Sequence, residues 1–206
     1  MKSSGQDRNR VRIIGGAWRS RVLRFPAAPG LRPTPDRVRE TVFNWLGQRL
    51  DGRRCLDLCA GSGAFGFEAA SRGAARVVMV EAAPLVVAAL QENARLLCAA
   101  AVQVARGDAL QFVQNVREEF DVAFVDPPYD SGLLAPLLEL LPRCLAQDGV
   151  VYFESGGPFS AAADWRVIRR GRAGAVHFQL AILSGEKSGN DQSSLRRDLR
   201  SDDAGP

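Results

Sequence analysis

Between residues 53 and 154, short apolar segments alternate with longer segments that can form helices. The short segments predict the strands Cys55–Cys59, Val77–Glu81, Val102–Ala105, Val122–Asp126 and Val150–Glu154. The segments between them predict the helices Ala64–Arg72, Pro84–Ala99, Ala109–Glu118 and Leu133–Leu145. Strands that alternate with helices form a mostly parallel, doubly wound sheet with right-handed crossovers, so the predicted fold class is α/β.

The segments on either side of this alternation each predict a hairpin. After Glu154, Trp165–Arg170 and Ala175–Leu183 are joined by Gly171-Arg172-Ala173-Gly174, and we expect them to add an antiparallel hairpin to the sheet edge. Near the N-terminus, Val11–Ile14 and Trp18–Phe25 flank Gly15-Gly16, which can form the turn of a second hairpin.

A helix is expected to begin after Thr34-Pro35, because Thr34 can cap it and proline suits the first helical position. Helical spacing is visible in the positions of Val38, Thr41, Val42, Trp45 and Leu46. We therefore expect a basic N-terminal hairpin and helix over residues 11–50 and a second domain over residues 51–183. The ends of the chain, residues 1–10 and 184–206, are rich in small and polar residues and predict disordered tails.

Positive charge is concentrated in the N-terminal part of the chain. Residues 1–54 hold 13 Lys and Arg against 4 Asp and Glu, a net of +9, whereas residues 55–206 have a net of −5. A basic arm on an acidic body favours a polyanionic partner, since each cation near a phosphate releases counterions. Charge alone does not distinguish such a partner from a solvated basic face.

Composition disfavours membrane, secreted and metal-binding proteins. The sequence contains no run of about 18 apolar residues and no apolar stretch near its N-terminus that resembles a secretory signal. The four cysteines lie in apolar surroundings without Cys-x-x-Cys spacing, which predicts small buried thiols at Cys55, Cys59, Cys98 and Cys144. We expect a cytoplasmic protein without disulfides or a structural metal, in which His177, the one histidine, is structural.

A glycine pattern, Gly61-x-Gly63-x-x-Gly66, follows the first predicted strand and opens a helix. With Glu81 twenty residues beyond Gly61, this pattern also fits a nicotinamide-dependent dehydrogenase. Asp57, just before the glycines, argues against that alternative, because a carboxylate opposes a pyrophosphate and suits a cation. S-adenosylmethionine has no phosphate and carries an ammonium group, so the loop favours this methyl donor.

Acidic residues also follow the next two predicted strands. Glu81 can accept hydrogen bonds from both ribose hydroxyls, and Asp108 can accept the adenine amino proton beside the Ala109 N–H. Each acid could instead cap a helix or lie on the surface, but three in turn at the carboxyl edge of a sheet favour a ligand site. The expected donor site comprises Asp57, Ala60, Gly61, Gly63, Glu81, Asp108 and Ala109.

The fourth predicted strand ends in Asp126-Pro127-Pro128-Tyr129, on the same edge of the sheet. Two consecutive prolines fix two φ angles and remove two N–H donors, which predicts a rigid corner with the Pro127 carbonyl facing a ligand. Asp126 and that carbonyl can accept the two protons of an exocyclic amine and favour a pyramidal nitrogen, whose lone pair then points at the methyl group. Tyr129 offers a face on which a flipped base can stack.

These residues resemble the RsmD family of bacterial 16S rRNA (guanine-N2)-methyltransferases over about residues 10–183. The most specific matches are Val11-Arg12-Ile13-Ile14-Gly15-Gly16 with Trp18-Arg19, and Leu31-Arg32-Pro33-Thr34 through Arg37-Val38-Arg39-Glu40-Thr41 to Phe43-Asn44-Trp45-Leu46. The donor loop and the Asp126–Tyr129 corner complete the resemblance but are shared with many amino-methyltransferases.

The resemblance implies a Rossmann-like class I S-adenosylmethionine-dependent methyltransferase fold and methylation of a guanine N2 amine in 16S ribosomal RNA. It implies that Thr34 and Glu40 line the cofactor site. RNA is expected to be held by Arg19, Arg21, Arg24, Arg32 and Arg37. The implied partner is 16S rRNA or a small-subunit particle. We expect a monomer, because nothing in the sequence demands a dimer.

Three alternatives remain at this stage. An adenine-N6 methyltransferase acting on DNA or RNA would use the same corner, although a DNA enzyme commonly carries an added recognition domain. A protein-amide methyltransferase usually has Asn at the position of Asp126. A non-catalytic RNA-binding assembly factor would not need the intact Asp57, Glu81, Asp108 and Asp126.

Overall fold

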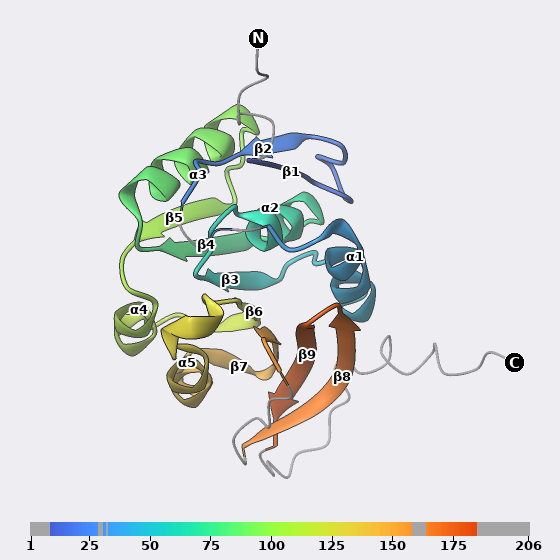
Figure 1. Ribbon diagram of the computed structural model, residues 1–206, viewed down its shortest axis with the longest axis vertical. Coiled ribbons are helices and arrows are strands. Elements are labelled where there is room, and N and C mark those ends of the chain that lie inside the picture. Colours follow the sequence, from blue (N-terminus) through green and yellow to red (C-terminus); the bar gives the residue numbers. More distant parts are fainter. Residues whose placement is uncertain (1–8, 29–30, 32, 158–163, 185–206) are drawn as a thin grey trace, which may run out of the picture.

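The computed structural model describes residues 9–28, 31, 33–157 and 164–184. Its main sheet has seven strands: β3 (Arg54–Leu58), β4 (Arg76–Glu81), β5 (Val102–Arg106), β6 (Phe120–Val125), β7 (Leu145–Ser155), β8 (Trp165–Ala173) and β9 (Val176–Leu183). The strand order is β5-β4-β3-β6-β7-β9-β8 (Figure 1). The first five strands in this order are parallel, and β9 is antiparallel to both β7 and β8. The α/β prediction with a C-terminal antiparallel hairpin is confirmed.

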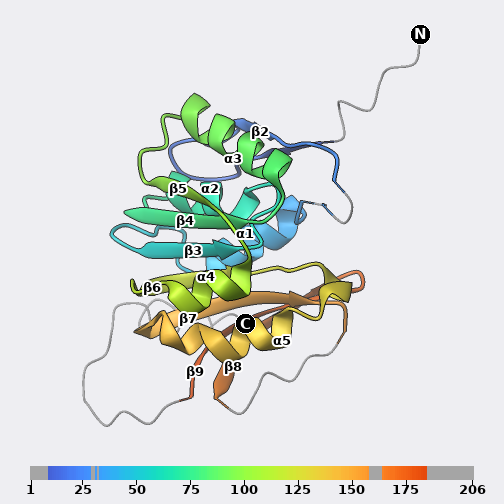
Figure 2. The ribbon, with the colours of Figure 1, turned by 90° about the vertical axis from the view of Figure 1, so that its left-hand side faces the viewer.

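Four helices connect the parallel strands and cover the two faces of the sheet (Figures 1 and 2). They are α2 (Ala64–Ser71), α3 (Pro84–Leu96), α4 (Ala109–Asn115) and α5 (Leu134–Leu140). One apolar cluster buries residues of α2 and α3, and a second cluster buries residues of α4 and α5. The interior strands contribute to both clusters because their side chains alternate between the faces. The carboxyl ends of the parallel strands therefore meet at one edge.

The last predicted helix, α5, is shorter than expected because of Pro142. Proline has no N–H, so it cannot bond the Leu138 carbonyl four residues earlier, and α5 ends at Leu140. A 3₁₀ turn, η3 (Leu141–Arg143), follows, and Leu145 begins β7 rather than ending the helix. The Leu138 carbonyl accepts instead from Trp165 Nε1 at 3.0 Å. Helices α3 and α4 also end three residues before the predicted Ala99 and Glu118.

The N-terminal hairpin forms, with shorter strands than expected. It pairs β1 (Arg10–Arg12) with β2 (Val22–Arg24) in antiparallel register. The prediction of one strand over Trp18–Phe25 is wrong, because the main-chain N–H groups of Ala17 and Trp18 donate to Ser71 at the end of α2. Gly16 lies in this turn with φ of +72°, and a Cβ there would be 1.9 Å from the Ser71 carbonyl oxygen. The hairpin turn is therefore shaped by docking on α2.

The predicted helix after Pro35 is α1 (Asp36–Trp45), and it buries Val38, Val42 and Phe43. The prediction that Thr34 caps this helix is wrong, because the N-cap residue is Pro35 and no side chain caps it. The Thr34 hydroxyl instead donates to Asp126 Oδ2 at 3.3 Å. The Thr34 hydroxyl therefore makes a tertiary hydrogen bond in place of the helix cap that the local sequence pattern predicted.

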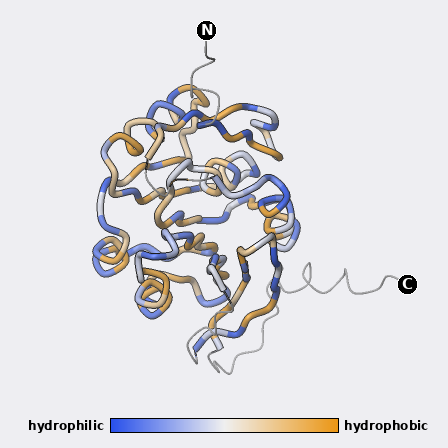
Figure 3. The backbone as a smooth tube through the Cα atoms, viewed as in Figure 1, coloured by the Kyte–Doolittle hydropathy of each residue, from blue (hydrophilic) through white to orange (hydrophobic). Residues whose placement is uncertain are grey.

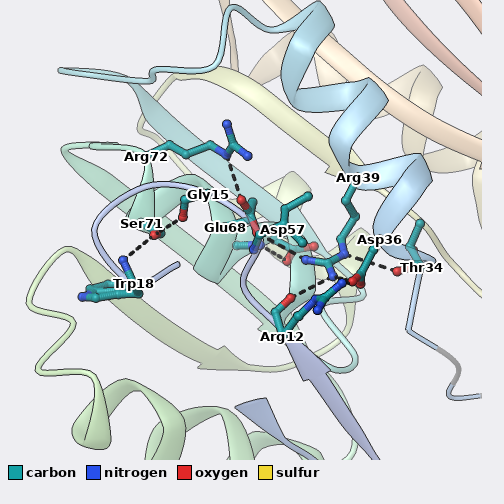
Figure 4. A network of polar contacts seen from close by, with 12 residues as sticks. Arg12, Gly15, Trp18, Thr34, Asp36, Arg39, Asp57, Glu68, Ser71 and Arg72 are labelled. Carbon is teal, nitrogen blue, oxygen red and sulfur yellow. Dashed lines mark hydrogen bonds and ion pairs between the residues drawn. The ribbon is translucent and has the colours of Figure 1, made fainter. Parts of the chain in front are cut away.

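A buried ionic network attaches this N-terminal part to α2 (Figure 4). Arg39 is 0% exposed, and its guanidinium donates to Glu68 Oε2 at 3.3 Å, to Asp36 Oδ1 at 2.6 Å and to the Arg12 carbonyl at 2.8 Å. Glu68 also accepts from the Ile14 main-chain N–H at 2.8 Å. A buried charge is tolerated only when it is paired and hydrogen-bonded, and these contacts meet that condition for Arg39.

The same network continues to the far end of α2. Arg72 Nε donates to Glu68 Oε1 at 2.8 Å, its guanidinium lies 4.7 Å from the centre of the Phe43 ring, and it also bonds the Gln48 carbonyl. Glu68 and Arg72 are four residues apart on one helix, so they lie on the same face. β1, α1 and α2 thus share one polar core.

Several smaller expectations concern single residues and the ends of the chain. Cys55 and Cys144 are buried and Cys59 is partly buried, but Cys98 is exposed, which contradicts its predicted burial. His177 lies half-buried in β9. Arg10 of the predicted N-terminal tail begins β1, while the rest of that tail before Asn9 and residues 185–206 lie outside the described residues. Among the helices of the described residues, none combines the length and apolarity that crossing a membrane requires.

Candidate functional site

The carboxyl edge of the sheet brings together four of the predicted acids. Asp57 of β3 is in register with Met79 of β4 and Phe124 of β6. Glu81 ends β4, Asp108 follows β5, and Asp126 follows β6. Since these strands are adjacent and parallel, their following loops lie along one rim, as predicted.

The loop between β3 and α2 is shaped by its glycines. Gly61 has φ of +51° and Gly63 has φ of +75°, in the region that favours glycine. A Cβ at Gly63 would be 2.6 Å from Leu90 and 2.7 Å from Phe67, so no side chain fits there. The main chain of this loop can therefore approach a ligand closely while α2 packs directly behind it.

Asp57 lies beneath this loop and is buried, at 4% exposure. Its Oδ2 accepts from the Gly66 main-chain N–H at 2.9 Å, and a Cβ at Gly66 would be 3.0 Å from the same oxygen. Burial raises the pKa of Asp57 well above its usual range, with further contributions from the charges of Asp126 and Glu81. Asp57 thus holds the first turn of α2 against β3 from beneath the loop.

Glu81 is bonded to main-chain N–H groups through both of its oxygens. Oε2 accepts from Gly61 at 3.0 Å, and Oε1 accepts from Ala83 at 2.9 Å. A carboxylate oxygen can accept more than one hydrogen bond, so these contacts orient Glu81 without using up its capacity. The predicted ribose acceptor is therefore already fixed at the rim.

Asp108 is exposed and performs one of the roles that the sequence left open, that of a helix cap. Its Oδ1 accepts from the Gln111 main-chain N–H at 2.9 Å, which makes it the N-cap of α4. Ala109, the first residue of α4, is buried. A helix start at this point of the rim presents main-chain N–H groups to a ligand beside β5.

Together these residues fit S-adenosylmethionine better than a dinucleotide. Two ordered acids that reach solvent along this rim, Glu81 and Asp108, place negative charge beside the glycine loop. Such a rim attracts the ammonium and sulfonium charges of the donor and repels a pyrophosphate.

The second half of the site is the corner after β6. Asp126 is followed by Pro127, which is buried, and by Pro128, whose carbonyl accepts from the Ser131 hydroxyl at 2.6 Å and starts the 3₁₀ turn η2 (Tyr129–Ser131). No donor from the described residues bonds the Pro127 carbonyl oxygen. The Pro127 carbonyl oxygen is thus left able to accept a hydrogen bond from a ligand.

Tyr129 is held by its hydroxyl while its ring remains accessible. The side chain is 52% exposed, and its OH donates to Glu154 Oε2 at 3.2 Å. Gly156 lies beside the ring, where a Cβ would be 3.7 Å from Tyr129 Cγ. An exposed ring anchored at its polar end is suited to stacking a planar group.

Glu154 is a site residue that the sequence interpretation missed. It is 4% exposed at the end of β7, where its Oε1 accepts from the Tyr152 OH at 2.6 Å and its Oε2 from the Tyr129 OH. The available signal was an acid at the end of the fifth predicted strand, in the same position as the acids that were selected on the other strands. A rule based on the whole carboxyl edge would have included it.

The half-buried Asp126 and the buried Glu154 therefore share this corner, where the negative charge of Glu154 disfavours ionisation of Asp126. The pKa of Asp126 is raised to about 8, chiefly by its removal from solvent and also by the negative charge of Glu154, while the hydrogen bond from the Thr34 hydroxyl opposes the shift. Burial also raises the pKa of Glu154, partly offset by hydrogen bonds from Tyr152, Thr34 and Tyr129. Close to neutral pH the pair can hold or release a proton.

Thr34 and Glu40, which only the family resemblance assigned to the cofactor site, lie in different parts of the structure. Thr34 lies at the corner through its bond to Asp126. Glu40 is exposed and lines a cavity of about 820 Å³ with Gly15, Asp51 and Arg72. Because Asp51 precedes β3 and Arg72 follows α2, that cavity lies toward the amino ends of the strands, away from the donor loop.

The predicted RNA-binding arginines are also dispersed. Arg19, Arg21, Arg24 and Arg37 are all exposed, and Arg32 lies outside the described residues. Arg19 lines the same 820 Å³ cavity as Glu40, next to Ser71 at the end of α2 farther from the donor loop. The structure thus separates Arg19 from the Asp126 corner.

Comparison with known proteins connects this geometry to a family. The family model described as Conserved hypothetical protein 95 matches residues 11–182. Ribosomal RNA small subunit methyltransferase D of Escherichia coli K12 is 42% identical over 175 residues, covering 82% of this chain and 88% of that protein. The enzyme of the same name from Haemophilus influenzae is 36% identical, covering 82% of this chain and 92% of that protein.

Solved structures agree with these matches. The Escherichia coli protein yhhF is 41% identical with a TM-score of 0.75, covering 84% of this chain and 97% of that chain. A precorrin-6y C5,15-methyltransferase from Geobacter metallireducens is 19% identical with a TM-score of 0.60, which shows a shared fold. The chain therefore belongs to the Conserved hypothetical protein 95 family, the RsmD family that the residues of its N-terminal hairpin, donor loop and Asp126 corner resemble.

Proposed function

We propose that the protein transfers a methyl group from S-adenosylmethionine to the exocyclic N2 amine of a guanine in 16S ribosomal RNA. The observation that carries this proposal is the half-buried Asp126, bonded to Thr34, ahead of Pro127-Pro128-Tyr129 on the same sheet edge as the glycine loop. The names of its relatives, ribosomal RNA small subunit methyltransferase D, support an rRNA substrate.

The donor would be held along the rim from β3 to β5. Glu81 would accept from the ribose hydroxyls, Asp108 and the Ala109 N–H would meet the adenine, and the backbone at Ala60, Gly61 and Gly63 would contact the methionine part. Asp57 would act from below, by holding Gly66 and the first turn of α2 in place. When bound, S-adenosylmethionine supplies an electrophilic methyl group on a sulfonium centre.

The acceptor amine would be prepared by Asp126 and the Pro127 carbonyl. The lone pair of an exocyclic amine is delocalised into the ring, so two acceptors that bind its two protons favour a pyramidal, more nucleophilic nitrogen. As the nitrogen forms its new bond to carbon, it must lose one proton. Asp126, with its raised pKa, is placed to accept that proton near neutral pH.

Tyr129 would stack on the flipped base and Glu154 would hold Tyr129 in position through its hydroxyl. Thr34 donates to Asp126 and therefore presents the carboxyl in one orientation. The proposed partner is 16S rRNA within an assembling or assembled small subunit, bound by a monomer in the cytoplasm, and the exposed arginines Arg19, Arg21, Arg24 and Arg37 would contribute to RNA binding.

The direct test uses small ribosomal subunits from a strain that lacks this protein. Incubation with purified protein and isotope-labelled S-adenosylmethionine, followed by nuclease digestion and mass analysis of nucleosides, should yield labelled N2-methylguanosine in 16S rRNA. Labelled N6-methyladenosine would instead support an adenine enzyme, and no labelled nucleoside would contradict the proposal. Free 16S rRNA in a parallel reaction distinguishes the naked RNA from the particle as substrate.

A further inference from the structure

Arg19, one of the predicted RNA-binding arginines, lies far from the acceptor corner. Arg19 lies beside Ser71, the last residue of α2, whereas the donor loop precedes the first residue of that helix. Eight helical residues span about 12 Å, so Arg19 is separated from the loop by the length of α2. A strand of RNA whose base enters the Asp126 corner needs cations nearer to it.

The β8–β9 hairpin carries such cations. Residues 165–183 contain four arginines and no Asp or Glu, whereas residues 55–157 hold 6 Lys and Arg against 13 Asp and Glu. The arginines all lie on β8, at positions 166, 169, 170 and 172, and Figure 3 shows hydrophilic stretches along this strand. Arg170 and Arg172 are exposed.

Strand register connects Arg172 to the corner. Arg172 of β8 is paired with His177 of β9, and His177 is paired with Ser155, the last residue of β7. Paired residues point to the same face of a sheet, and neighbouring strands are about 4.8 Å apart, so the Cα atoms of Arg172 and Ser155 are about 10 Å apart. Ser155 is followed by Gly156, which lies beside the Tyr129 ring.

This row therefore runs from Ser155, next to Gly156, to Arg172 beside the turn of the hairpin. Arg172 Nε donates to the Gly174 carbonyl at 2.9 Å, which holds the side chain at the turn of the hairpin. Arg170 lies two residues back along β8 and points to the same face as Arg172, so the two cations are neighbours.

We propose that Arg170 and Arg172 of β8 bind the phosphates of the RNA strand whose base stacks on Tyr129. The proposal rests on the function proposed above, because it assumes an RNA substrate. It assigns contacts close to the chemistry to the C-terminal hairpin and leaves Arg19 to more distant phosphates.

The structural alternative is edge protection. β8 is the last strand of the sheet within the described residues, and charged side chains on an edge strand prevent pairing with another chain. Edge protection requires the charges for solubility but not for RNA binding, so the two explanations predict different results when RNA affinity is measured.

The test is the salt dependence of RNA binding by the full chain with Arg170→Gln and Arg172→Gln combined. Fluorescence anisotropy with a labelled 20-nucleotide single-stranded RNA, over a series of salt concentrations, gives the slope of log affinity against log salt. Each lost phosphate contact lowers that slope by about 0.7 for a single strand, so we expect a reduction of about 1.4 and affinity weaker on the order of tenfold near 0.1 M salt.

The matched control is Arg117→Gln with Arg143→Gln, which removes two exposed arginines located before β6 and β7, toward the amino ends of the strands. This control should leave the slope nearly unchanged. An unchanged slope in the β8 variant, with a melting temperature like that of the unmodified protein, would overturn the proposal. If the double variant is partly unfolded, two single variants replace it. Arg172→Lys keeps the charge and should keep the slope, whereas Arg172→Gln should lower the slope by about 0.7.

This experiment measures binding and needs no methyl transfer. If nucleoside analysis finds no N2-methylguanosine but the β8 variant still loses salt-dependent affinity, the proposed reaction fails and the RNA surface stands. If methylation proceeds and the β8 slope is unchanged, the reaction stands and the RNA surface fails.

Discussion

The donor rim and the acceptor corner both use buried or ordered carboxyls, but the groups that bind these carboxyls differ. On the donor rim, Asp57, Glu81 and Asp108 accept from main-chain N–H groups. At the acceptor corner, Asp126 and Glu154 are met by hydroxyls, from Thr34, Tyr129 and Tyr152. A main-chain N–H can only donate, whereas a hydroxyl can donate or accept.

The two groups of acids therefore have different roles: those of the donor rim maintain the conformation of the loop, and those of the acceptor corner can take up or release a proton. The donor-rim acids must act as acceptors to keep the loop in place, so their contacts serve one geometry. The acceptor-corner acids can keep hydrogen bonds in either protonation state, because a hydroxyl can reverse its role. A site that must receive a proton from its substrate benefits from the second arrangement.

The largest expected effect follows from removing the reacting carboxyl. Asp126→Ala should lower kcat by at least about a hundredfold, because the amine loses one acceptor and the acceptor of its departing proton. Binding of S-adenosylmethionine, measured by calorimetry, should change little, because the donor-rim contacts do not involve Asp126. A variant that keeps full activity would contradict the role of the corner.

The second largest effect is expected when a carboxyl of the donor rim is removed. Glu81→Ala removes the acceptor for the Gly61 and Ala83 N–H groups as well as the proposed ribose contact, so the Kd for S-adenosylmethionine should rise on the order of tenfold to a hundredfold. RNA affinity should be unaffected. The control is Glu92→Ala, which removes an exposed acid of α3 that pairs with Arg95, and the idea fails if both variants bind the donor equally well.

A smaller effect is expected at Glu154, where charge and hydrogen bonding can be separated. Glu154→Gln keeps an oxygen for one of the two tyrosine hydroxyls and offers an NH2 group to the other, which can accept from it, but it removes the negative charge that raises the pKa of Asp126. The pKa of Asp126 should therefore fall, by about one unit, and remain above its ordinary value because the group is still buried. Asp126 would then stay ionised to lower pH.

The measurement is carbon-detected NMR titration of the free protein, together with the pH profile of kcat/KM. If ionised Asp126 is the active form, the rise of kcat/KM with pH should move to lower pH in Glu154→Gln. The other groups that face Asp126 are Thr34, Asp57, Cys59, Tyr129 and Tyr152, all retained in this variant.

Tyr129→Phe serves as the matched variant, because it removes the hydroxyl tether and leaves the charge of Glu154 in place. It should raise the KM for RNA and leave the pH at which kcat/KM rises nearly unchanged. An unshifted titration of Asp126 in Glu154→Gln would show that the two carboxyls do not interact.

The sequence predicted the sheet and most of the rim because both follow from local patterns. Apolar strands can be predicted from their composition. An acid at the end of a strand must lie at the edge of the sheet where that strand ends, as Glu81 and Asp126 show. Thr34 could not be placed in this way, since its hydroxyl bonds a residue 92 positions away instead of capping α1. The pairing of Arg39 with Glu68 is equally non-local, so neither residue stood out in the sequence.

The interior location of Arg39 also has a consequence for the order in which the chain folds. Its partner Glu68 lies 29 residues later, so a growing chain makes the guanidinium well before the carboxylate that permits its burial. Until α2 exists, packing α1 would leave a cation uncompensated in the apolar interior, which is strongly unfavourable. A fragment that ends at residue 60 is therefore expected to show no stable helix by circular dichroism. The N-terminal segment, although synthesised first, would complete its folding only after the donor loop and α2 have followed it.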